Sequence, residues 1–76
     1  MIIKVLGSGC TKCKTLENHA RQAVEELNLD ASVEKVEDIQ EIMAYGVMKT
    51  PALVVDGTVK IMGRVPSVED IKKLLG

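Results

Sequence analysis

A short apolar strand, a glycine-rich turn and a long amphipathic helix follow one another at the start of this chain. Residues 2–6 form a nearly continuous apolar run, and the Gly-Ser-Gly turn at 7–9 comes directly after it. Such a run is typical of a strand buried on both faces. From residue 11 to about residue 27, apolar side chains recur every three or four positions, which places them on one face of a helix. The sequence therefore begins with the strand–turn–helix unit of a layered α/β domain.

The middle of the chain predicts a second strand and a second helix. Residues 31–36 mix polar and apolar side chains in a way that suits a strand at the edge of a sheet. Asp38 and Glu41 have the spacing of a helix capping box, and Gly46 can adopt the left-handed conformation that ends a helix. We therefore expect a short helix in between. Its apolar face would consist of Ile39, Ile42 and Met43, and Met43 and Met62 would fill the core.

The last third of the chain predicts a hairpin and a closing helix. The Asp56-Gly57 pair tolerates the positive φ angles of a tight turn, and it separates an apolar strand at 52–55 from a return strand at 58–62. Ser67 has the position of a helix N-cap. The element order is thus β-α-β-α-β-β-α, which predicts an α/β fold with a four-stranded mixed sheet and three helices that cover both of its faces.

Length and charge narrow the classes of function. The chain has 76 residues, which is the size of one domain, and we expect residues 1–76 to form a single domain. A formal net charge of -1 provides no strong field for a phosphate backbone or an anionic membrane, so we expect no nucleic-acid or membrane partner. No stretch approaches the roughly 18 apolar residues that span a bilayer. We expect a cytoplasmic monomer.

Both cysteines lie where the first strand gives way to the first helix, in the motif Cys10-Thr11-Lys12-Cys13. The first sulfur then lies at the helix N-terminus, where free amides and the helix dipole stabilise a thiolate. Lys12 adds positive charge nearby and is a candidate for tuning the pKa of Cys10. Cys10 can attack a substrate disulfide, and Cys13, one helical turn later, can resolve the mixed disulfide.

Two other roles for the cysteine pair have to be weighed. The cysteines could be small buried apolar residues, although both lie in a polar, glycine-rich turn. The segment 9–13 also resembles the soft-metal loop of heavy-metal-associated domains, in which two thiolates hold Cu(I) or zinc. That family continues with the order helix-strand-strand-helix-strand. Here a second helix precedes the hairpin and the chain ends in a helix, so metal binding remains the alternative and not the preferred function.

The whole chain resembles the thioredoxin-like superfamily, and within it the small archaeal and bacterial thioredoxin- or glutaredoxin-like redox proteins. Four motifs carry the resemblance: Gly-Ser-Gly-Cys-Thr-Lys-Cys at 7–13, Thr50-Pro51, Asp56-Gly57 and Ile61-Met62-Gly63-Arg64. The resemblance implies a thiol–disulfide oxidoreductase that works through a reversible Cys10–Cys13 disulfide without a further cofactor or metal. It also implies a cis Thr50–Pro51 bond beside the disulfide, with Thr50, Pro51 and Gly63 binding extended substrate.

The same resemblance implies disulfide-bearing client proteins and a flavin-dependent dithiol reductase as partners. We find no clear set of glutathione-binding residues, which favours a thioredoxin-like dithiol cycle. Lys4 stands where thioredoxins carry a buried acid that assists proton transfer, and this departs from the family pattern. Of the remaining polar residues, we expect His19 to be solvated on the first helix and Tyr45 to pack at the end of the second.

Overall fold

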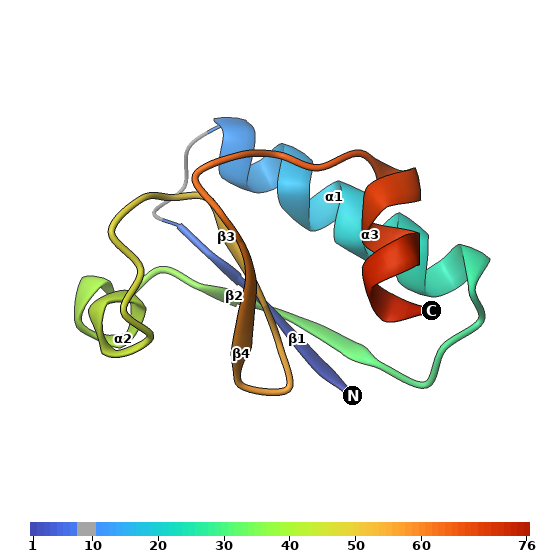
Figure 1. Cartoon of the computed structure of the whole chain (residues 1–76), viewed down its shortest axis with the longest axis horizontal. Coiled ribbons are helices and arrows are strands. Elements are labelled where there is room, and N and C mark those ends of the chain that lie inside the picture. The colour runs from blue at the N-terminus through green and yellow to red at the C-terminus, as the bar shows by residue number, and fades with distance from the viewer. Residues whose placement is uncertain (8–10) are drawn as a thin grey trace.

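The computed structural model describes residues 1–7 and 11–76, and within them it has the predicted order of strands and helices (Figure 1). The elements are β1 (Ile2–Leu6), α1 (Thr11–Glu26), β2 (Ser32–Val36), α2 (Ile39–Ala44), β3 (Ala52–Val55), β4 (Thr58–Met62) and α3 (Val68–Leu75). The predicted α/β fold, with a four-stranded mixed sheet and three helices, is confirmed for the described residues. None of the helices in this part of the chain is long and apolar enough to cross a bilayer.

The strands lie in the order β2-β1-β3-β4, so the first strand of the chain is inside the sheet. β1 pairs in parallel with β2 and antiparallel with β3. β2 is an edge strand, as its mixed pattern predicts. The turn between β3 and β4 has positive φ at Asp56 (49°) and Gly57 (83°), which confirms the predicted hairpin.

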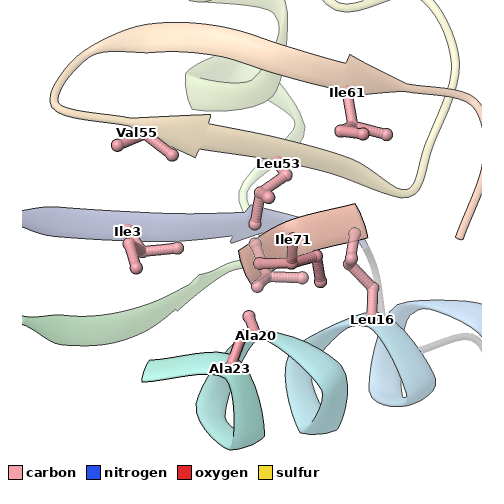
Figure 2. Close-up of a cluster of buried hydrophobic side chains, with 9 residues drawn as sticks. Ile3, Leu16, Ala20, Ala23, Leu53, Val55, Ile61 and Ile71 are labelled. Carbon is pink, nitrogen blue, oxygen red and sulfur yellow. The ribbon is translucent and has the colours of Figure 1, made fainter. Parts of the chain in front are cut away.

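Helices cover both faces of the sheet and produce two separate cores. Figure 2 shows the larger core, in which α1 and α3 pack on one face of the sheet. Its buried members are Ile3, Val5, Leu16, Ala20, Ala23, Leu53, Val55, Ile61 and Ile71. The smaller core lies on the other face and consists of Leu6, Val36, Ile42, Val47, Ala52 and Val54, with Tyr45 and Val59 packed against it. The alternation along β3 divides its four buried residues between the two cores.

Part of the predicted core is wrong. Ile39 and Met43 are 64% and 67% exposed, and in α2 only Ile42 is buried. This helix has six residues, and its inward side follows Ile42 and Tyr45, which are three positions apart and therefore on one side of the helix. Met62 is 48% exposed because it ends an edge strand, on the face opposite to the buried Ile61.

β1 is also less enclosed than its apolar run suggests. Ile2 is 46% exposed and Lys4 is half-buried, whereas Ile3, Val5 and Leu6 are completely or almost completely buried. The strand is therefore covered on both faces only toward its C-terminal end. That end leads into the cysteine motif.

Candidate functional site

Cys13 lies in the first turn of α1 and faces the interior of the protein. It is 1% exposed and is disulfide-bonded. The helix begins at Thr11, so Cys13 is held by regular backbone from the first turn onward. Cys10, the predicted attacking cysteine, falls outside the described residues. The structure thus places one of the two predicted sulfurs, in a buried position against the end of the sheet.

Gly7 allows that position, because it has no side chain. A Cβ at Gly7 would overlap Cys13 Sγ, and it would stand 3.1 Å from Cys13 Cβ and 3.9 Å from Thr50 Cβ. Its backbone N–H donates to the Val36 carbonyl at 2.9 Å, which fixes Gly7 at the end of the sheet. The sequence pattern predicts only a turn at this glycine. A glycine between a buried strand and a cysteine motif is a signal of close backbone approach, and it could have identified Gly7.

The Thr50–Pro51 peptide bond is cis, the isomer that the resemblance implies. Pro51 is buried and precedes β3, whose first residue, Ala52, pairs with Leu6 of β1. This register places Pro51 beside the end of β1, next to Gly7. Thr50 is exposed. The two residues therefore present one buried ring and one accessible side chain at the edge of the site.

Gly63 lies next to the segment that contains Lys49 and Pro51. Its N–H donates to the Pro51 carbonyl at 2.9 Å, and its φ is +77°. A Cβ here would stand 3.2 Å from Lys49 Cβ and 3.3 Å from Lys49 Cδ, so the Lys49 side chain lies against the bare glycine. Positive φ and close packing both favour glycine at this position.

A groove of about 450 Å³ joins these residues to the start of α1. It is lined by Thr11, Lys12, Thr15, Thr50, Pro51, Gly63, Arg64 and Val65. The structure therefore brings together four of the predicted site residues, namely Lys12, Thr50, Pro51 and Gly63. Sequence reasoning did not assign Thr11, Thr15, Arg64 or Val65 to the site. Arg64 was inside a quoted motif, but only the fold shows that it lines the groove.

Lys4, at the position where the resemblance implies a buried acid, contacts Tyr45 on the face of the sheet that α2 covers. Its ammonium group donates to the Tyr45 hydroxyl at 3.1 Å and lies 5.7 Å from the centre of the ring. The hydrogen bond to Tyr45 is the largest cause that raises the pKa of Lys4 above its ordinary value. Lys4 thus stays charged and ties the end of α2 to the sheet. Tyr45 packs there as expected.

The expectation that His19 is solvated is wrong. The side chain is half-buried, and Nδ1 donates to the Pro66 carbonyl at 2.8 Å. The bond forms because α3 and the segment before it pack along α1. Pro66 is 47 positions away in the sequence, so local pattern gave no indication of this contact.

Comparison with known proteins gives matches over the whole chain. The model of the thioredoxin domain matches residues 1–76. A protein named thioredoxin from Methanothermobacter thermautotrophicus is 49% identical over 75 residues, which are 99% of this chain and 97% of the relative. Another protein named thioredoxin, from Methanocaldococcus jannaschii, is 40% identical over 75 residues, 99% of this chain and 86% of the relative. These relatives match the chain over almost its full length.

Proposed function

The chain belongs to the thioredoxin domain family and is a thiol–disulfide oxidoreductase, and on that premise we propose that Cys10 and Cys13 are its redox pair. Cys10 is the attacking sulfur and Cys13 the resolving sulfur. The observation that carries this proposal is the position of Cys13, which is disulfide-bonded and 1% exposed in the first turn of α1. A sulfur so deeply buried cannot be approached by a protein substrate. The attacking role therefore falls to the other cysteine of the sequence.

The proposed reaction moves two electrons from the dithiol to a client disulfide. The Cys10 thiolate attacks one client sulfur, a mixed disulfide forms, and the second client sulfur leaves as a thiolate that takes up a proton. Cys13 then loses its proton and attacks Cys10 Sγ. The Cys10–Cys13 disulfide forms, the client is released with both of its cysteines reduced, and no cofactor beyond this disulfide is needed.

The groove supplies the remaining parts of the proposal. Thr50, Pro51 and Gly63 line the groove together, and the hydrogen bond from the Gly63 N–H to the Pro51 carbonyl holds their two segments side by side; we assign these residues to binding extended client chain. Lys12 lines the same groove and lies between the two cysteines in the sequence, and we assign it to tuning the Cys10 thiolate. The charge of an exposed lysine is screened by water, so its effect is smaller than that of the helix amides.

The partners follow from the chemistry. Family membership indicates disulfide-bearing clients and a reductase that restores the dithiol. We propose that this reductase is a flavin-dependent dithiol enzyme, and that the chain works as a monomer in the cytoplasm, where cysteine pairs serve catalysis more often than structural cross-linking. The soft-metal alternative has no support, since both relatives carry the name thioredoxin and α2 and α3 do not fit the element order of the heavy-metal-associated domains.

Trapping of mixed disulfides tests the two cysteine roles. Cys13→Ser keeps the attacking thiolate but removes the resolving one, so client proteins from an extract should accumulate as covalent adducts. Cys10→Ser should trap far fewer, and the Cys10→Ser/Cys13→Ser double variant is the background control. Adducts are resolved by non-reducing electrophoresis and released with dithiothreitol. Stronger trapping by Cys10→Ser would show that the roles are reversed.

A second measurement addresses the thiolate directly. Alkylation of the reduced protein across a pH series should modify Cys10 first, with an apparent pKa below the ordinary cysteine value of about 8.5. Mass spectrometry after a short pulse identifies the labelled cysteine. Equal labelling of the two cysteines at every pH would contradict the proposed division of roles.

A further inference from the structure

We propose that the groove selects client disulfides whose flanking residues carry carboxylates. This inference rests on the proposed function and names its class of substrate. The groove has two ionisable residues in its lining, Lys12 and Arg64, and both are cationic. An extended segment with Glu or Asp beside its cysteine would bring opposite charge to both.

These cations have no carboxylate partner within the protein that the structure describes. The ion pairs found there engage Arg21, Lys35 and Lys72 on other parts of the surface. Lys49, whose side chain lies against Gly63, is likewise absent from those pairs. The positive charge at the groove is therefore available to a ligand.

Acidic residues are segregated away from the groove along the chain. The segments 11–16 and 46–68, which supply every lining residue, contain a single acid, Asp56. The acids that directly follow these segments are Glu17 and Glu69, and each forms an ion pair within its own helix. Asp56 accepts a hydrogen bond from the Ile2 N–H at 2.8 Å, so it lies at the N-terminal end of β1. Gly7 and the groove lie at the opposite end of that strand, and Figure 1 shows the hairpin turn and the start of α1 at opposite ends of the sheet.

The ionisable groups that line the groove are therefore positively charged, whereas the whole chain has a formal net charge of -1. Charges separated by more than about 8–10 Å are largely screened at moderate salt, so a client segment in the groove responds to Lys12, Lys49 and Arg64 more than to distant acids. Exposed charges of this kind act mainly on the rate of association and on its salt dependence. We therefore expect selectivity in the rate of the attack step.

Two matched peptide disulfides test the inference. They are identical except that the residues flanking the reactive cysteine are Glu in one and Gln in the other. Pre-reduced protein is mixed with excess peptide, and the reaction is stopped with acid and followed by chromatography, because the chain has no tryptophan to report it. Rates with dithiothreitol correct for the intrinsic reactivity of each disulfide. At low salt, each ion pair between a peptide Glu and a groove cation should raise the corrected Glu/Gln rate ratio by a factor of about two to five. At high salt the ratio should approach one.

Variants assign the effect to the groove. Arg64→Gln should lower the corrected rate ratio by about two- to fivefold. Lys73→Gln removes the same charge from α3, outside the groove, and should leave the ratio unchanged. A wild-type ratio of one, or equal effects of the two variants, would overturn the inference while leaving the oxidoreductase function intact.

Two further outcomes keep the hypotheses apart. If neither peptide is reduced, the proposed function itself fails. If glutathione disulfide is reduced faster than the Glu peptide, and Arg64→Gln slows only that reaction, the cations serve a small anionic thiol and the inference about client proteins is wrong.

Discussion

His19 Nδ1 donates a hydrogen bond of 2.8 Å to the carbonyl oxygen of Pro66. The bond connects α1, which carries Cys13, to the segment before α3, in which Arg64 and Val65 line the groove. Pro66 is fully buried, so its carbonyl has little access to water as a replacement partner. One side chain therefore links the helix that carries Cys13 to the segment that contributes Arg64 and Val65 to the groove.

Removing this link should destabilise the fold. His19→Leu leaves a poorly hydrated carbonyl without its donor and should lower the free energy of unfolding by about 1–3 kcal/mol. His19→Asn can place an amide N–H near the position of Nδ1. It should therefore keep part of the stability that His19→Leu loses. Urea unfolding followed by far-ultraviolet circular dichroism measures both. Equal losses in the two variants would mean that the hydrogen bond itself contributes nothing specific.

Substitution by alanine should destabilise the protein at Gly7 and at Gly46 for different reasons. Gly7→Ala forces a methyl group against Cys13 Sγ, and overpacking of this kind costs about 1–3 kcal/mol. Gly46→Ala meets no atom within 4 Å, so its cost comes only from the φ of +76° and should be about 1 kcal/mol. The two reduced variants should also differ in the rate at which the disulfide forms. Only Gly7→Ala displaces the resolving sulfur, so only this variant should form the disulfide more slowly. Stopped alkylation measures that rate, and an unaffected rate in Gly7→Ala would argue against the tight contact.

Glu26 should contribute to stability at neutral pH and lose that contribution in acid. The hydrogen bond from Gln22, followed by that from Lys72, lowers the pKa of Glu26 below its ordinary value of 4.5. A group whose pKa is depressed in the folded protein stabilises it above the unfolded pKa and ceases to do so as the pH falls through the folded pKa. Stability should thus decline below about pH 4.5, and Glu26→Gln should make that decline shallower. Unfolding midpoints at pH 7 and pH 3 measure the difference, with Glu25→Gln as the control for net charge.

The short helix α2 should tolerate change at its exposed positions and not at its buried one. Ile42→Ala opens a cavity in the smaller core and should cost about 2–4 kcal/mol. Met43→Ala removes a side chain of similar size that is 67% exposed and should change stability by less than about 0.5 kcal/mol. Thermal unfolding of the two variants side by side checks the contrast. A large loss in Met43→Ala would restore the original prediction that this residue fills the core.

Local patterns were sufficient to predict every element of the described chain. The apolar spacing of α1, the caps at Asp38 and Ser67 and the Asp56-Gly57 turn each depend on neighbouring residues, and the structure reproduces them. The groove residues Thr50, Pro51 and Gly63 were predicted through the family resemblance. No periodicity indicates that such distant residues converge.

The failures share a physical origin. Ile39, Met43 and Met62 have apolar side chains at plausible core positions, but their exposure is decided by how far the neighbouring elements extend over the sheet. The contacts of His19 and Gly7 depend on packing between segments that are remote in sequence. Composition and spacing contain no information about such contacts until the topology is known.

The strand order also bears on how the protein is made. β1 leaves the ribosome before β2, β3 and β4, yet it lies between β2 and β3 and its pairing with β3 requires residues 52–55. Until those residues have been translated, the nascent chain has an open, apolar strand edge that can pair with other chains. Pro51 and Gly63 emerge at the same late stage. The growing chain therefore carries both cysteines before Pro51 and Gly63, which line the groove, have been synthesised.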